Sequence, residues 1–158
     1  STTAGRVLTL AEGASGGSTY AERALWVTAT GGVVAGGRYS SAASWTTSTS
    51  GVQVNDGRGH LLTVVWTNTA TSNVAPSIRI DGVAATTTTS GTVTYRARTS
   101  SGSSASWYVG ANSAGRLPSG APTAALQAAY DEFIVVAGTP SATLLGSGPG
   151  SLYTAADL

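Results

Sequence analysis

The chain has no cysteine, no methionine and no lysine among its 158 residues. Without cysteine it can form neither a disulfide framework nor a thiolate metal site, and its redox compartment cannot be read from the sequence. Its single histidine, His60, leaves few nitrogen ligands for zinc and argues against such a site. The same lone histidine, together with the lack of a G-x-S-x-G motif, argues against a serine hydrolase.

Charge is also scarce. Only 9% of the residues are charged, and the eight arginines and seven acids give a formal net charge of +1. The arginines are scattered, so no basic patch of the kind that binds nucleic acid is expected. No apolar run is long enough to span a membrane, and no signal peptide is present. The use of arginine alone is typical of a GC-rich coding source, such as an actinobacterium or its phage.

What the chain does contain points to β-structure. Apolar residues make up 41% of the sequence, enough for collapse at this small net charge. Short runs rich in threonine and valine alternate with glycine- and serine-rich turns, which is typical of an all-β sandwich. At this length we expect one domain over residues 1–158. The absence of an initiator methionine indicates a processed chain or a fragment of a longer one.

The most informative stretch is 55–83. Asp56-Gly57 predicts a turn, and the apolar run 60–66 predicts a buried strand. A polar loop follows, and then residues 77–80 alternate, with Ile78 and Ile80 expected on one face of a short strand. Asp81-Gly82 predicts a tight hairpin turn, since both residue types tolerate positive φ.

Other strands are predicted at 6–10, 24–30, 33–35, 92–98, 105–111 and 130–137, with a hairpin turn at Gly31-Gly32. Residues 86–90 form a threonine run with high β-propensity. Residues 124–129 are compatible with a helical turn or with a strand lead-in, and 154–158 with a short helix. Trp26, Trp66 and Trp107 lie in apolar strands, so core packing is expected for each.

The central stretch resembles the laminin-G-like, concanavalin-A-like jelly-roll family, whose signature runs D-G-x-x-H-x-φ-x-φ-x-W/F followed by φ-φ-φ-D-G, φ being apolar. Residues 107–111 and 130–135 resemble two later strands of that family, in the same order. The resemblance covers roughly residues 8–136. It implies a two-sheet antiparallel β-sandwich and carbohydrate, glycoconjugate or protein recognition. It also implies that His60 is a structural residue at the start of a strand.

One feature departs from the family pattern. The chain starts one strand late, at Arg6. A diverged N-terminal strand, a fragment of a longer protein, and an edge supplied by a neighbouring subunit each explain this. Because an unpaired sheet edge invites strand addition, a homo-oligomer is one of the open alternatives.

Catalytic carboxylates are not evident. Retaining glycosidases need two carboxylates about 5 Å apart, and jelly-roll glycosidases carry them in an E-x-D-x-x-E type motif that this chain lacks. Asp131-Glu132 is the only adjacent acidic pair, and neighbours on a strand point to opposite faces. The pair is interpreted as structural, and the domain as non-enzymatic.

Calcium is the one cofactor considered, because many domains of this family bind it at the rim of the sandwich. Calcium takes six to eight oxygen ligands, and the acids here do not cluster. Asp56, with Asn55, and Asp131 are the candidate metal ligands, each needing backbone carbonyls to complete a site.

Candidate ligand contacts lie in the polar stretch 36–47. Arg38, Tyr39 and Trp45 stand there among serine, glycine and alanine. Aromatic rings stack on sugar faces, and an arginine adds donors for hydroxyls. The alternative is that these aromatic rings pack onto the sandwich.

The sequence therefore predicts a binding module for a glycan or cell-surface polymer, extracellular or on a virion, such as part of a phage tail. The alternative is a structural virion decoration or assembly domain without a small ligand. A glycoside hydrolase with unusual carboxylates is a third hypothesis.

Overall fold

The computed structural model describes residues 4–13, 19–37, 46–66, 75–91, 105–110, 121–130 and 134. These residues contain β-strands and no helix. None of them therefore belongs to a helix able to cross a lipid bilayer. The strands are β1 (Gly5–Gly13), β2 (Thr19–Val27), β3 (Gly32–Gly37), β4 (Thr46–Gln53), β5 (Leu62–Val65), β6 (Ser77–Ile80), β7 (Val83–Ala84), β8 (Thr87–Ser90) and β9 (Ala105–Val109).

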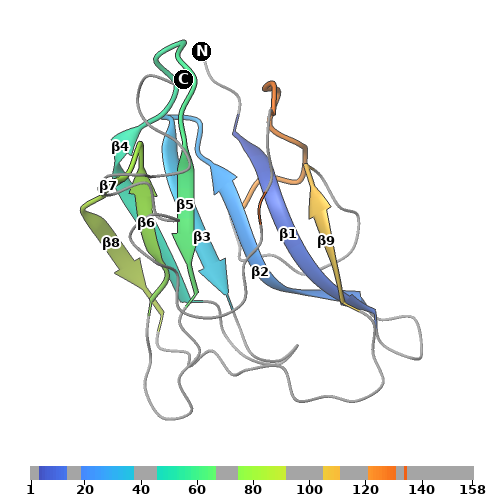
Figure 1. The fold of residues 1–158 in the computed structure, drawn as a ribbon. Coiled ribbons are helices and arrows are strands. Elements are labelled where there is room, and N and C mark those ends of the chain that lie inside the picture. The colour runs from blue at the N-terminus through green and yellow to red at the C-terminus, as the bar shows by residue number, and fades with distance from the viewer. Residues whose placement is uncertain are drawn as a thin grey trace.

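The strands form two sheets. One is six-stranded, with the order β8-β4-β3-β2-β1-β9, and the other is three-stranded, with the order β5-β6-β7. All the strand pairings in both sheets are antiparallel. In Figure 1 the smaller sheet lies across the part of the larger sheet that contains β3 and β4. The prediction of an all-β fold with two antiparallel sheets is thus confirmed for the described residues.

The centre of the large sheet is the β2-β3-β4 meander. The predicted hairpin turn between β2 and β3 is confirmed, with Gly31 at a φ of 88°. The amide of Gly31 donates to the carbonyl of Thr28, and the amide of Thr28 donates to that of Gly32. Glycine is required at position 31 both by this φ and because a Cβ there would collide with the Asn55 side chain.

The main core lies between the two sheets. Ile78 and Ile80 of β6 are buried, whereas Arg79 between them is only half-buried. This confirms the predicted alternation in residues 77–80. The two isoleucines pack in one cluster with residues from three strands of the large sheet: Val7, Leu8, Leu25, Val27, Val33 and Ala35. All are aliphatic and most are β-branched, which suits the pleated surface of a sheet.

A second, smaller cluster consists of Ala24, Trp26 and Val34, with Ala121 against it. Trp26 is buried, which confirms its core assignment. Arg6 pairs with Trp26 across the strands and is itself buried, and its Nε donates to the carbonyl of Pro122 at 2.7 Å. Burial lowers the pKa of Arg6 from its ordinary value of 12.5. The N-terminal strand is thereby tied to residues 121–126.

Residues 124–129 form neither a helical turn nor a regular strand. Ala125 makes one parallel bridge to Arg6, in which the amide of Arg6 donates to Ala124 and the amide of Leu126 donates to Arg6. Gly5 is required here, because a Cβ on it would overlap the backbone of Leu126. Because β1 also pairs with β2 and β9, it is an inner strand of the large sheet.

Three other predicted elements fall wholly or partly outside the described residues. These are the strand at 92–98, the helix at 154–158 and most of the late strand at 130–137. Tyr130 and Ile134, the described residues of that late strand, are not in a strand and are both exposed.

Strand β4 was not predicted from the sequence, because it contains almost no apolar residue. The side chains that it buries are those of Thr46, Ser48 and Ser50. Ser50 accepts a hydrogen bond from the amide of Val33 at 2.9 Å and donates to the carbonyl of Val52 at 2.7 Å. The hydroxyl of Ser48 is buried and has no hydrogen-bond partner in the part of the chain that the structure describes.

Substituting these two serines should therefore have opposite results. Ser50→Ala leaves the buried amide of Val33 without an acceptor, so we expect the free energy of unfolding to fall by about 1–3 kcal/mol. Ser48→Ala removes a buried hydroxyl that makes no bond, so we expect no loss or a small gain. Denaturant unfolding of the two variants, which match in chemistry and strand, measures both. Equal losses would contradict the assignment.

Candidate functional site

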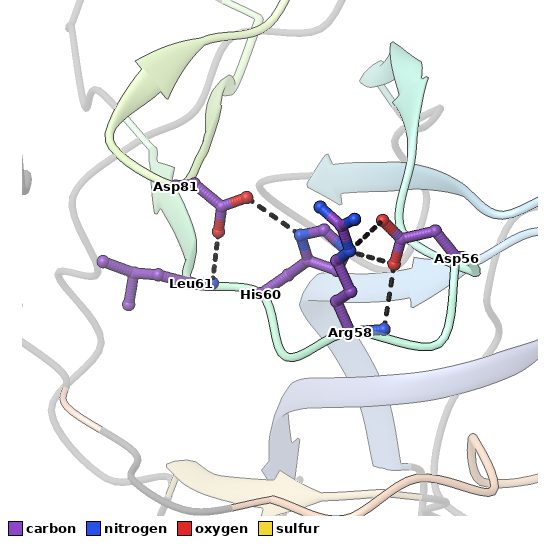
Figure 2. A network of polar contacts seen from close by, with 5 residues as sticks. All are labelled: Asp56, Arg58, His60, Leu61 and Asp81. Carbon is purple, nitrogen blue, oxygen red and sulfur yellow. Dashed lines mark hydrogen bonds and ion pairs between the residues drawn. The ribbon is translucent and has the colours of Figure 1, made fainter. Parts of the chain in front are cut away.

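The central stretch predicted from the sequence forms one network of polar contacts at the end of the sandwich where the chain leaves β4. His60 lies between two carboxylates (Figure 2). Its Nε2 is 2.9 Å from Oδ1 of Asp56, and its Nδ1 is 2.9 Å from Oδ2 of Asp81. Both aspartates belong to Asp-Gly pairs, so the two turns of the signature meet at one imidazole.

The first turn is built by Asp56 itself. Oδ1 of Asp56 accepts the amide of Arg58 at 3.0 Å, an aspartate turn of the common i to i+2 kind. Gly57 between them has a φ of 85°. The guanidinium of Arg58 lies 3.9 Å from Oδ2 of Asp56, but its side chain is 83% exposed, so this ion pair adds little.

The second turn is the predicted hairpin between β6 and β7. Asp81 and Gly82 have φ values of 54° and 78°, the two positive angles of a two-residue turn of type I′. Asp81 is held to Leu61 twice, since its amide donates to the carbonyl of Leu61 and its Oδ1 accepts the amide of Leu61 at 2.8 Å. These two bonds fix the carboxylate that faces His60.

The charges favour a protonated ring. An ionised carboxylate only accepts hydrogen bonds, so both ring nitrogens must carry a proton for both contacts to form. Burial by itself lowers the pKa of His60, but the hydrogen bonds and negative charges of Asp81 and Asp56 outweigh it and raise the pKa above 6.5. Hydrogen bonding to His60 lowers the pKa of Asp56 below 3.8, and the amide and charge of Arg58 add to this effect.

This arrangement is suited to holding two turns together. An imidazolium with both N–H groups engaged cannot accept a proton, and the network of Figure 2 contains no hydroxyl or thiol that it could activate. Within the described residues, no group of three or more His, Cys, Asp or Glu side chains is placed to hold a metal ion. The carboxylate of Asp56, the candidate metal ligand that is described, contacts His60 and Arg58 instead.

Four predicted site residues lie outside the described residues: Arg38, Tyr39, Trp45 and Asp131. The first three stay predictions, although the ends of their segment are described. Gly37 at the end of β3 pairs with Thr46 at the start of β4, so residues 38–45 connect two neighbouring strands of the large sheet. That connection lies at the opposite end of β4 from His60.

The two other tryptophans expected in the core are described to different extents. Trp66 is half-buried beside the main cluster, and its Nε1 donates to the carbonyl of Gly36 at 3.0 Å. That bond runs from the end of β5 to β3, so it links the two sheets. Trp107 lies in β9, as predicted for its backbone.

The network itself was missed by sequence reasoning, which placed His60 at a strand start without partners. One local signal was available, because Asp56 stands four residues before His60 beside a flexible glycine. Asp81 is separated from His60 by 21 positions, and only the pairing of β5 with β6 brings it close.

The chain was also compared with known proteins. No family model, no curated protein and no solved structure matches it.

Asp81 should contribute more to stability than its exposure suggests. Asp81→Ala removes the acceptor of both His60 and the amide of Leu61, so we expect the free energy of unfolding to fall by about 1–3 kcal/mol. Asp81→Asn tolerates the positive φ and can still accept from Leu61, so its loss should be smaller. Thermal unfolding at pH 5.5 compares the two variants; a larger loss for Asp81→Asn would contradict this account.

Proposed function

We propose that the chain is a laminin-G-like, concanavalin-A-like jelly-roll module that binds a carbohydrate or cell-surface glycoconjugate without catalysing a reaction. Such a module acts outside the cell or on a virion, for example in a phage tail. It needs no bound cofactor for folding, with calcium as the ion to test.

The observation that carries the jelly-roll assignment is the contact network. The residues that give the sequence its resemblance, Asp56, His60 and Asp81, are far apart in the chain yet bind one another. Residues that matched a signature by chance would have no reason to meet. The two antiparallel sheets also agree with this family's architecture.

Glycan recognition is proposed for residues 38–45. The segment carries Arg38, Tyr39 and Trp45 among small residues, and β3 and β4 hold its two ends in register. Binding sites on β-sandwiches are commonly built on connections of this kind, which a rigid sheet positions. Planar aromatic side chains supply contact area for a sugar face at little entropic cost.

The main alternative is a structural domain of a virion, which would use a flat oligomeric face and bind no small ligand. Exposed apolar side chains on or beside the edge strand β9, Tyr108 and Val109, are compatible with it. A glycoside hydrolase is less well supported, because the one pair of carboxylates that the described residues bring together, Asp56 and Asp81, has an imidazole between them.

Glycan binding is tested by screening the purified protein against glycans and cell-wall polysaccharides, with calcium and with a chelator. We expect saturable binding that the double variant Tyr39→Ala/Trp45→Ala lowers at least tenfold, about 1.4 kcal/mol. Loss of binding in chelator would add a metal to the site.

The matched control is Tyr108→Ala, which removes an exposed aromatic side chain from β9 and should leave binding unchanged. Equal losses in the control and the double variant would contradict the assignment of residues 38–45. If no glycan binds and size-exclusion chromatography shows a stable oligomer, the structural alternative replaces the proposal.

A further inference from the structure

We propose that His60 is a pH-sensitive latch. As an imidazolium it joins the turn at 56–58 to the Asp81-Gly82 turn, and when it loses a proton it releases Asp56 while keeping Asp81. The inference concerns the end of β4 opposite residues 38–45, roughly 25 Å away for a strand of this length. It therefore does not depend on glycan binding.

The first step is the geometry of the charged form. Both ring nitrogens are 2.9 Å from a carboxylate oxygen, so neither contact can be made by an unprotonated nitrogen without placing two acceptors against each other. The side chain of His60 is only 13% exposed, so water cannot easily replace a lost partner. Removing one proton must therefore break one of the two contacts.

The second step is which contact breaks. Asp81 is 34% exposed, and the amide of Leu61 holds it in place at 2.8 Å. Asp56 is 47% exposed and belongs to a surface turn with a flexible glycine. The more exposed carboxylate is better able to turn toward water. We therefore expect the neutral ring to keep its proton on Nδ1, facing Asp81, and to release Asp56.

The other charged groups nearby reinforce this order. Arg58, from the same turn as Asp56, gives that carboxylate a second positive partner at 3.9 Å. Arg79, from β6, donates to the carbonyl of Gly82 at 2.9 Å and steadies the turn that carries Asp81. Among the described residues, these two arginines and two aspartates are the charged groups of the latch.

The pH window follows from the directions of the two pKa shifts. The pKa of His60 is raised, so its contribution to stability is complete below 6.5 and is lost as the pH rises through the folded-state value. The pKa of Asp56 is lowered, so its contribution is present above 3.8 and is lost as the pH falls through its folded-state value. The latch is therefore fully closed between these limits.

The latch acts on the crossing between the sheets. Residues 54–61 carry the chain from β4 of the large sheet to β5 of the small one. The amide of Val54 donates to Gly31 at one end of this crossing, and Leu61 is bound to Asp81 at the other. Release of Asp56 frees the middle of the crossing and leaves both ends attached, so the exposed turn changes while the fold persists.

The test is an NMR titration of the ¹⁵N-labelled full chain from about pH 5 to pH 9. Its one histidine makes the imidazole signal unambiguous. We expect a His60 pKa above 6.5, a neutral form protonated on Nδ1, and a shift of the Arg58 amide with the same midpoint. The Arg58 amide should lose its protection from hydrogen exchange above that midpoint, whereas the Leu61 amide should keep it.

Three results would overturn the latch. They are a neutral ring protonated on Nε2, an Arg58 amide that does not respond, and loss of protection at Leu61 together with Arg58. Asp56→Asn provides the matched variant, because it should lower the pKa of His60 without unfolding the protein. The titration is repeated with calcium and with chelator; a midpoint that moves with calcium would make Asp56 a metal ligand and overturn the proposal.

Discussion

The packing of the two sheets depends on how the chain crosses between them. It leaves the large sheet after β4, forms the three strands of the small sheet, and returns at residues 85–86 to place β8 beside β4. The imidazolium of His60 braces the outward crossing, while the bond from Ala85 to Ile78 anchors the return. Burial of Ile78 and Ile80 against Val33 and Ala35 requires both crossings to hold their lengths.

The elements that could be predicted were those whose signals are local. Strand β6 and its turn were predicted to the residue, because alternating isoleucines and an Asp-Gly pair specify face and turn within six positions. Strand β4 could not be predicted, because serine and threonine do not announce burial. Their burial is decided by the neighbours β3 and β8, and sequence pattern carries no information about that pairing.

The same limit applies to the candidate site. Its three residues were all visible in the signature, and His60 was interpreted as structural. The contact between His60 and Asp81 exists only because β5 pairs with β6 in one register, Leu62 opposite Ile80. A slip of one residue would turn the side chains of β5 to the opposite face, away from their partners. Arg38, Tyr39 and Trp45 stay predictions of sequence alone.

The pairing of β1 on both sides has a consequence for the order of folding. Its hairpin partner β2 follows within a few residues, whereas Leu8 pairs with Val109 and Arg6 binds Pro122, a separation of 116 positions for the latter. Closing so long a loop costs more entropy than closing a hairpin, so these contacts form late. During synthesis, β1 therefore waits with one edge open until about a hundred further residues have been made. In that interval the nascent chain presents a strand edge to its neighbours, which the finished domain conceals.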